Sequence, residues 1–363
     1  MRIALTHAYS WPEVRRGAER FLPSLGAALA RRGHEVTHFS SAWEPGRETM
    51  GGLTTIRLAR RVEEQYGHEA DFSRRLLPHL ARGNFDAVHS LGRRDAVASI
   101  RAARLRRGRR TVFTDLGLPL RSYWATVGPS EERAVEKVVK GVDVYSGMSQ
   151  CAVDHLEREY GRSDGVVVPG GVDTGVFVPA PAREPRPTIL FSGAFAEPYK
   201  EVALLLEALS LVAEREPEVQ LWLSGPGDCG PLLEAASPAA RERTRNLGLG
   251  EAERQHERNG RAWVTCLPSR FDSFGMVLIE ALSCGTPIVT TTQGAPQELV
   301  DPGVTGELSE PGDPRGLAGA LLRALDLARV SGTTEACRAA AEPFDWDRSL
   351  APLAERLYCG ERA

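Results

Sequence analysis

Residues 267–291 form the segment that most restricts how this chain can fold, because glycine and proline divide its apolar runs into short elements. The apolar run that ends at residue 267 stands before a proline and is typical of a buried strand. Ser273 is suited to cap a following helix, and Gly285 is suited to end it. The β-branched residues 288–291 then predict a second strand. The segment thus predicts a strand, a helix and a strand in succession.

The start of that helix is where the segment can do chemistry. The first N–H groups of a helix have no partner within it and form an anion site, most naturally for phosphate. Gly275 leaves room for a ligand to approach the backbone, Asp272 precedes the helix, and Glu280 shares a helix face with Met276. Carboxylates beside a phosphate site suit sugar hydroxyls, so these residues together predict a nucleotide-sugar site. An amphipathic helix with solvated acids is the alternative.

The beginning of the chain predicts a second unit of the same kind. Residues 2–6 and 34–40 are typical of strands, and residues 18–32 between them are typical of a helix. Four residues form the apolar stripe of that helix: Phe21, Leu25, Ala28 and Leu29. A strand–helix–strand opening predicts an α/β fold with a parallel sheet. Gly17 precedes the helix, where N–H groups can meet a phosphate, although a plain loop glycine is the alternative.

Length and composition exclude several classes of protein. A chain of 363 residues predicts two or more domains, and 42% hydrophobic with 26% charged residues is typical of a soluble globular protein. The net charge of −3 argues against a nucleic-acid-binding protein. The six cysteines form no CxxC pair and no histidine cluster has metal spacing, so we expect reduced thiols, no metal site and a cytoplasmic location. No apolar run is long enough to predict a membrane-spanning helix, and no signal peptide is predicted.

Residues 267–291 resemble the signature of the retaining GT-B glycosyltransferases of family 4, also called glycosyl transferases group 1. That family carries a Glu, seven residues and a second Glu, with Phe-Gly just after the first. In this chain Asp272 opens the sequence DSFG and Glu280 follows, so the first carboxylate is one methylene shorter. The resemblance covers nearly the whole chain and is strongest over residues 1–38 and 188–325.

The resemblance implies the GT-B fold, an α/β arrangement of two Rossmann-like domains with parallel sheets that face a central cleft. Residues 1–181 would form the acceptor domain, and residues 182–345 the nucleotide-sugar domain. The boundary between them is expected in a proline-rich segment, residues 179–188. Residues 346–363 would form a helix that crosses back to the first domain.

The resemblance also implies the reaction. A hexosyl-type sugar would pass from a nucleotide-diphospho-sugar, such as a UDP- or GDP-sugar, to an acceptor hydroxyl with retention of configuration, without a metal ion or cofactor. His89 would lie by the sugar near the acceptor, Lys200 would hold the departing diphosphate, and Asp272 would hold sugar hydroxyls. The implied donor-binding residues are Gly17, Gly193, Lys200, Arg270, Asp272, Ser273, Phe274, Gly275, Met276 and Glu280, the last at the ribose. A lone His after a strand is more often structural, but strand ends face the ligand cleft in this fold, and Asp86 with His89 matches the family motif Asp-x-x-His.

Two departures from the family concern the donor phosphates. Ala194 stands where the family has Arg, and Glu201 replaces a glycine that follows the lysine. Loss of one cationic contact could cost about 3 kcal/mol of transition-state stabilisation. Arg270 is a candidate substitute, as is either Arg15 or Arg16. On the acceptor side, Asp115 occupies a position where many relatives have His, and the acceptor could be a small molecule, a glycan or a lipid.

Three other functions remain open from the sequence. The chain could be a non-catalytic nucleotide-sugar-binding protein, because Ala194 removes a phosphate contact. It could be a sugar-nucleotide epimerase or hydrolase on the same fold. It could be an NAD enzyme, because the NAD-binding pattern GxGxxG follows a strand at Gly225, Gly227 and Gly230. The pattern does not lie in the first strand–helix turn of the chain, where an NAD-binding fold carries it. An arginine-rich run at 101–110 allows peripheral membrane contact at most, and a solvated helix end is its alternative.

Overall fold

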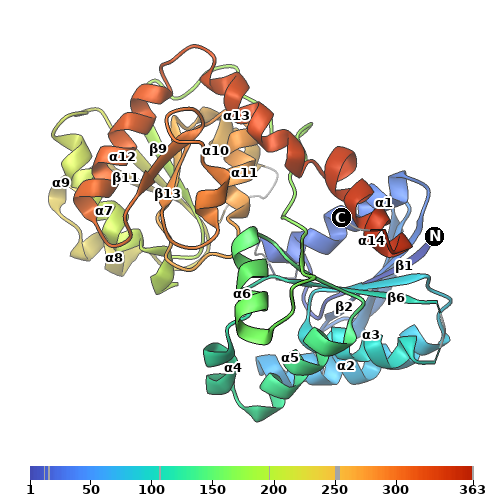
Figure 1. The fold of residues 1–363 in the computed structure, drawn as a ribbon. Coiled ribbons are helices and arrows are strands. Elements are labelled where there is room, and N and C mark those ends of the chain that lie inside the picture. Colours follow the sequence, from blue (N-terminus) through green and yellow to red (C-terminus); the bar gives the residue numbers. More distant parts are fainter. Residues whose placement is uncertain (12, 15–16, 106–107, 196, 250–253, 362–363) are drawn as a thin grey trace. The chain divides into compact units, whose positions relative to one another are not determined.

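The computed structural model describes residues 1–11, 13–14, 17–105, 108–195, 197–249 and 254–361. These residues divide into two compact units. The first comprises Met1–Gly171 with Trp346–Ala363, and the second comprises Val172–Asp345. Each unit is an α/β layer structure around one sheet (Figure 1). Among the described residues, no helix has the length and apolarity needed to span a membrane.

The sheet of the first unit has the strand order β3-β4-β2-β1-β5-β6-β7-β8. All neighbouring strands run parallel except β3, which is antiparallel to β4. The strands are β1 (Arg2–Thr6), β2 (Glu35–Ala42), β3 (Gly46–Met50), β4 (Leu53–Ala59), β5 (Ala87–Ser90), β6 (Arg110–Asp115), β7 (Val144–Gly147) and β8 (Val166–Val167). The parallel sheet that the opening residues predict is therefore confirmed.

Helices cover both faces of this sheet, with α2, α3 and α5 on one face and α1 with α14 on the other. Their bounds are η1 (Ala18–Arg20), α1 (Phe21–Arg31), α2 (Gln65–Arg82), α3 (Arg93–Ala103), α4 (Arg121–Val127), α5 (Pro129–Gly141), α6 (Gln150–Tyr160), the π-helix η6 (Trp346–Leu350) and α14 (Ala351–Cys359). The apolar stripe predicted on α1 is buried: Phe21, Leu25, Ala28 and Leu29 are at most 1% exposed.

The C-terminal segment belongs to the first unit. The Trp346 and Phe21 rings pack in a T-shaped arrangement with their centroids 5.3 Å apart. The Arg32 guanidinium donates to both oxygens of Glu355, at 2.6 and 2.8 Å. This hydrogen bonding lowers the pKa of Glu355 to about 2. The division between the units falls ahead of the proline-rich segment, because the backbone N–H of Val172 already bonds to the carbonyl of Phe344 in the second unit.

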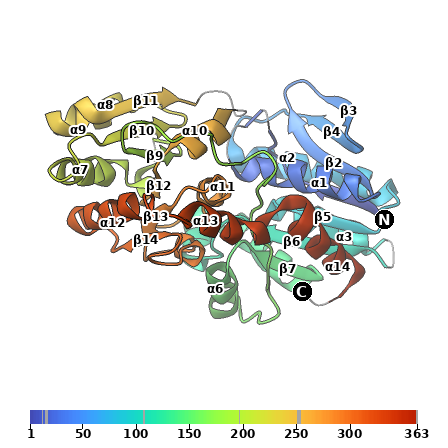
Figure 2. The ribbon, with the colours of Figure 1, turned by 90° about the horizontal axis from the view of Figure 1, so that it is seen from above.

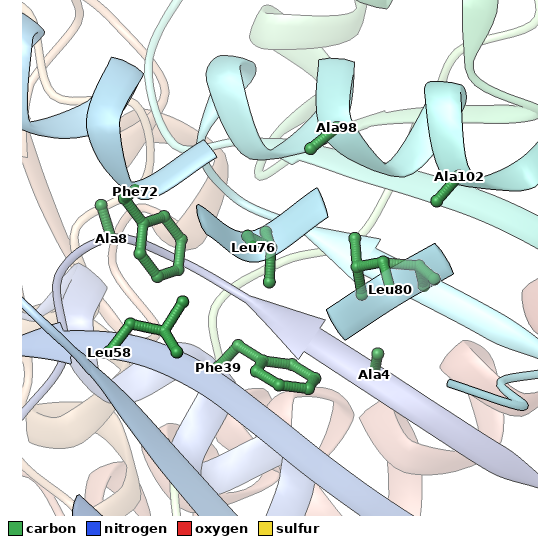
Figure 3. Close-up of a cluster of buried hydrophobic side chains, with 10 residues drawn as sticks. Ala4, Ala8, Phe39, Leu58, Phe72, Leu76, Leu80, Ala98 and Ala102 are labelled. Carbon is green, nitrogen blue, oxygen red and sulfur yellow. The ribbon is translucent and has the colours of Figure 1, made fainter. Parts of the chain in front are cut away.

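One apolar cluster of the first unit lies between α2, α3 and the sheet. Figure 3 shows Phe72 and Leu76 of α2 facing Phe39 and Leu58 of the strands. The cluster contains Ala4, Ala8, Phe39, Leu58, Phe72, Leu76, Leu80, Val88, Ala98 and Ala102. Burying side chains of this size stabilises a fold by about 1.5–3 kcal/mol each, so the cluster is a main source of stability for this unit.

Truncation within this cluster should destabilise the first unit. Leu76 is fully buried, and we expect Leu76→Ala to lower the free energy of unfolding by about 2–5 kcal/mol through lost burial and the cavity left behind. Urea denaturation followed by circular dichroism measures this change. Leu105→Ala is the matched control, because Leu105 is 70% exposed. Equal midpoints for the two variants would contradict the assignment of this core.

The sheet of the second unit has the strand order β11-β10-β9-β12-β13-β14, and every neighbouring pair is parallel. Figure 2 shows this order from above. The strands are β9 (Thr188–Ser192), β10 (Gln220–Ser224), β11 (Thr244–Gly248), β12 (Val264–Leu267), β13 (Ile288–Thr291) and β14 (Gly306–Ser309). The helices are η2 (Pro198–Lys200), α7 (Val202–Ala213), α8 (Gly230–Ala235), α9 (Pro238–Arg243), α10 (Gln255–Arg261), α11 (Met276–Ser283), η4 (Pro296–Leu299), α12 (Pro314–Leu327), α13 (Thr333–Ala341) and η5 (Glu342–Phe344).

The strand, helix and strand predicted for residues 267–291 are present as β12, α11 and β13. The helix start differs from the prediction, because α11 begins at Met276 and Gly275, not Ser273, is the residue before it. Gly275 has φ +99°, which is rarely adopted by a residue with a Cβ. The residue before the helix is thus a glycine in a left-handed conformation, and the predicted Ser273 cap is wrong.

Candidate functional site

Two loops of the second unit carry most of the predicted site residues. One follows β9 and leads into α7, and the other follows β12 and leads into α11. β9 and β12 are parallel neighbours in the sheet. Their carboxyl ends therefore lie at the same edge, which is where ligands bind in open α/β sheets.

Lys200 and Asp272 meet between these two loops. The Lys200 Nζ lies 2.8 Å from each carboxylate oxygen of Asp272. Both side chains are largely covered, with 15% and 16% exposed. Lys200 ends the 3₁₀ turn η2, and its N–H donates to the carbonyl of Glu197. The sequence placed both residues in one site, and in the structure the two side chains form an ion pair.

A second ion pair joins the same two loops. The Arg270 Nε lies 2.6 Å from an Oε of Glu201. The Arg270 backbone N–H also donates to the carbonyl of Tyr199, at 3.0 Å. The two loops are thus held by two ion pairs and a backbone hydrogen bond. Sequence reasoning assigned no role to Glu201 beyond a departure from the family pattern.

The start of α11, at Met276, lies four residues after Asp272. Gly275, Met276 and the next residue are partly exposed, whereas Phe274 is buried and meets Phe344 at a ring-centroid distance of 5.6 Å. Phe274 therefore anchors the turn and does not present its ring to solvent. The first N–H groups of this eight-residue helix have no carbonyl within the helix. The helix start thus places polar backbone groups close to the Lys200–Asp272 pair.

The other residues predicted for the donor lie around these loops or within α11. Glu280 follows Met276 by one helical turn and is 7% exposed. Ser273 is partly exposed. Gly193 follows β9, and its N–H donates to the carbonyl of Ser224 at 2.9 Å. A Cβ on Gly193 would lie 3.9 Å from the Lys200 Cδ, so the lysine stem passes close to this glycine.

The GxGxxG pattern begins at a backbone crossing. A Cβ added to Gly225 would lie 1.9 Å from the carbonyl oxygen of Gly193, and Gly225 has φ +155°. The glycine therefore allows the loops after β9 and β10 to touch. This packing explains why the pattern starts with glycine, and the pattern lies in the second unit, away from the first strand–helix turn.

Replacing Gly225 tests this crossing. We expect Gly225→Ala to destabilise the second unit by more than the roughly 1–3 kcal/mol that an unfavourable backbone conformation costs alone, because the Cβ also overlaps a backbone oxygen. Thermal unfolding measures the loss. Gly303→Ala is the control, since Gly303 has φ +76° and no atom within 4 Å of the added Cβ. A Gly225→Ala variant as stable as Gly303→Ala would disprove the overlap.

In the first unit, His89 stands at the end of β5 and is fully buried. Its Nδ1 lies 2.8 Å from the Tyr358 hydroxyl, and its Nε2 lies 2.7 Å from the Thr114 hydroxyl. Burial lowers the pKa of His89 to about 3, so the ring is neutral near pH 7. Both ring nitrogens are engaged within the unit, which favours a structural role in this structure. Contact with the donor sugar stays a prediction.

Gly17, the other predicted donor residue of the first unit, lies in the loop after β1. Gly17 is exposed, and its carbonyl accepts the N–H of Arg20 at 3.2 Å, so it opens the turn that leads into α1. Arg15 and Arg16, the other candidate substitutes for the family arginine, lie outside the described residues.

Two buried acidic residues that sequence reasoning missed, Asp95 and Glu131, lie in the first turns of α3 and α5. Asp95 is fully buried at the start of α3, where it accepts the N–H of Gly92, and burial raises its pKa well above the usual range. Glu131 accepts from Arg93 at 2.7 Å. Asp115, which the sequence singled out on the acceptor side, is partly exposed and accepts the Tyr145 hydroxyl at 2.6 Å, and desolvation raises its pKa. A glycine followed three residues later by an aspartate is the one local signal that could have indicated Asp95.

Two α/β units, each built around a mainly parallel sheet, are the architecture of the GT-B fold. A sucrose-phosphate synthase from Thermosynechococcus elongatus has the same fold, with a TM-score of 0.84, 21% identity and coverage of 99% of this chain and 98% of that one. HepE from Anabaena, solved with UDP-glucose, has a TM-score of 0.76 and 18% identity, and 99% of this chain and all of that chain are covered. The GT-B fold expected from the sequence is confirmed.

The family follows from sequence comparison. Residues 15–176 match Glycosyltransferase Family 4, and residues 186–326 match Glycosyl transferases group 1. The phosphatidyl-myo-inositol mannosyltransferase of Mycobacterium leprae is 31% identical, with 74% of this chain and 71% of that protein covered. The protein of the same name from Mycolicibacterium smegmatis is 28% identical, with 90% and 85% covered. The chain belongs to glycosyltransferase family 4 and is a glycosyltransferase.

Proposed function

We propose that this glycosyltransferase moves a hexosyl unit from a UDP- or GDP-sugar to an acceptor hydroxyl, with retention of configuration and without a metal ion or other cofactor. The observation that carries the proposal is the contact of Lys200 with Asp272, which stands four residues ahead of the start of α11. A cation, a carboxylate and the N–H groups of a helix start are the chemistry that a sugar diphosphate requires.

The diphosphate would be held by Lys200 and by the N–H groups at the start of α11. Negative charge grows on the departing phosphate as the bond to the sugar breaks, and fixed positive groups stabilise that charge. A helix start and an ammonium group together supply the neutralisation that a divalent cation supplies in other transferases. This arrangement supports a metal-independent reaction.

The two carboxylates would orient the rest of the donor. Asp272 would exchange part of its contact with Lys200 for hydrogen bonds from sugar hydroxyls when a donor binds. Glu280, one turn into α11 beyond Met276, would accept from the ribose hydroxyls. Gly275 would let the diphosphate approach the backbone, since no side chain stands there.

Retention is proposed on the likeness to family 4. The acceptor oxygen would attack the anomeric carbon from the face that the diphosphate leaves, and a phosphate oxygen of the leaving group would take the acceptor proton. This route needs no pair of carboxylates around the anomeric carbon. The rate of this route would depend on stabilising the negative charge of the departing phosphate, and therefore on Lys200 and the start of α11.

The acceptor is proposed from the printed names of relatives. Curated relatives include phosphatidyl-myo-inositol mannosyltransferases and D-inositol 3-phosphate glycosyltransferases. An inositol-bearing acceptor, free or on a lipid, is therefore the first to test, and a lipid acceptor would bring the enzyme to a membrane surface without insertion.

The proposal is tested by incubating the enzyme with UDP-glucose, UDP-N-acetylglucosamine and GDP-mannose, each with myo-inositol, inositol phosphate or phosphatidylinositol in EDTA. We expect one combination to give a glycoside whose anomeric configuration, read by NMR, equals that of the donor. An inverted product would refute retention, and a reaction abolished by EDTA would refute metal independence. Free sugar without glycoside would identify a hydrolase instead.

A further inference from the structure

We propose that Arg270 is a ligand of the donor diphosphate and that Glu201 is the internal counter-ion that holds Arg270 until the diphosphate displaces it. This inference rests on the proposed function and adds to it a pair of residues that position and select the phosphate groups. Their ion pair, at 2.6 Å, belongs to the same two loops as the pair of Lys200 with Asp272.

The two ion pairs are adjacent because of their spacing in the sequence. Lys200 and Glu201 are consecutive, and Arg270 and Asp272 are two residues apart, so each loop contributes one cation and one anion. The hydrogen bond from the Arg270 N–H to the Tyr199 carbonyl, at 3.0 Å, fixes the loops in this register. The four charges sum to zero. A diphosphate that reaches this place therefore meets cations whose charge is already balanced by carboxylates.

The backbone at Glu201 indicates that its side chain is needed there. Glu201 has φ +53° and ψ +39°, and within the described part of the chain it is the one residue other than glycine with a positive φ. Residues with a Cβ are disfavoured in this left-handed conformation, whereas glycine adopts it freely. A glutamate at such a position is stabilised by what its carboxylate binds, and here it binds Arg270.

The Glu201–Arg270 pair is exposed enough for a phosphate to displace Glu201 from Arg270. Arg270 has 45% of its side chain exposed and Glu201 has 19%. Ion pairs with this much solvent access contribute little, whereas a guanidinium binds a phosphate with two parallel hydrogen bonds and a full charge. The Arg270 guanidinium also lies 3.2 Å from where a Cβ on Gly312 would stand, so glycine at that position leaves room for the group.

Arg270 supplies the charge that Ala194 lacks. Lys200 carries one positive charge, whereas a diphosphate carries at least two negative charges at neutral pH. Arg270, released from Glu201, would bring the count of cations to two. Because Glu201 competes with the phosphate for Arg270, the pair also limits how tightly the nucleoside diphosphate product is held.

Calorimetric titration of UDP and GDP into wild type and variants tests this exchange. We expect Arg270→Ala to weaken binding of the recognised diphosphate by about 10- to 100-fold, the effect of removing a hydrogen bond to a charged group. Glu201→Gln should tighten binding by about 2- to 5-fold, because a competing exposed ion pair is lost. In the Arg270→Ala background, Glu201→Gln should change nothing. The single variant Glu201→Asp, which keeps the carboxylate, should bind the diphosphate with the wild-type affinity.

The matched control is the exposed ion pair of Arg323 with Glu307 in the same unit. It has an Nε–Oε distance of 2.8 Å, with 57% and 14% of the two side chains exposed. Arg323→Ala and Glu307→Gln should leave the titration unchanged. Wild-type binding by Arg270→Ala, or tightening by Glu201→Gln that persists without Arg270, would overturn the inference while leaving the proposed function intact. If wild type binds neither diphosphate, the proposed donor site itself fails.

Discussion

Lys200→Ala is expected to lower the turnover number for glycosyl transfer by about 10²- to 10³-fold, which is the usual loss when one group that stabilises developing charge is removed. The Lys200 Nζ is held at 2.8 Å from Asp272 in a largely covered place, so it is fixed where the phosphate would arrive. Its charge is needed most when the sugar–phosphate bond breaks. The turnover number should therefore fall more than the Michaelis constant for the donor rises.

Lys140→Ala is the control for this prediction, because Lys140 is 78% exposed and pairs loosely with Glu136 on the same helix of the first unit. It should retain the wild-type rate. Lys200→Arg should recover part of the rate, since the charge remains but the shape differs. A Lys200→Ala enzyme that works within about threefold of wild type would remove Lys200 from the mechanism.

The free energy of unfolding should fall as the pH drops below about 6.5, in large part through the buried histidines His38 and His89 of the first unit. Burial lowers the pKa of His38 and of His89 from 6.5 to about 3. Between pH 6.5 and about pH 3 these histidines bind a proton in the unfolded chain but not in the folded chain, so acid favours unfolding. Each histidine should contribute a loss of about 1.4 kcal/mol per pH unit from about pH 6.5 down to about pH 3, and none above that range.

A variant isolates this effect from the carboxylates, which titrate at similar pH. His38 is 1% exposed, and within the described residues neither of its ring nitrogens has a hydrogen-bond partner. His38→Leu should thus fold well, and its free energy of unfolding should fall less steeply with acid than that of wild type. Urea denaturation at a series of pH values measures the slopes. Parallel slopes for wild type and His38→Leu would show that His38 is not held neutral by the fold.

The fold could be predicted because its signals are local. A few neighbouring residues were enough to predict each of three elements: α1 from its apolar stripe, the strand at residues 2–6, and α11 from the glycines at its ends. The order of those elements then gives parallel sheets, since parallel strands need a helical crossover. The Ser273 cap failed because local capping preference was outweighed by a glycine that turns the chain at Gly275.

The site was predictable only in part, because its pairings join distant segments. The residues after β9 and β12 could be placed at one sheet edge, but the contact of Lys200 with Asp272, 72 residues later in the chain, depends on β9 and β12 becoming neighbours. The surroundings of His89 also depend on a distant segment. The Tyr358 hydroxyl, from the far end of the chain, lies 2.8 Å from one of its nitrogens, and the contact of His89 with the donor sugar stays a prediction.

The most direct test of the central claim, that Lys200 and the start of α11 hold a sugar diphosphate, is a thermal-shift panel of UDP, GDP, ADP, dTDP, NAD and NADP, with and without EDTA. A ligand at a hundred times its dissociation constant adds about 2.7 kcal/mol to stability, which such a scan detects. We predict a clear shift with one nucleoside diphosphate that EDTA leaves unchanged and that Lys200→Ala reduces. No shift with any diphosphate, or a shift with NAD or NADP alone, would contradict the account.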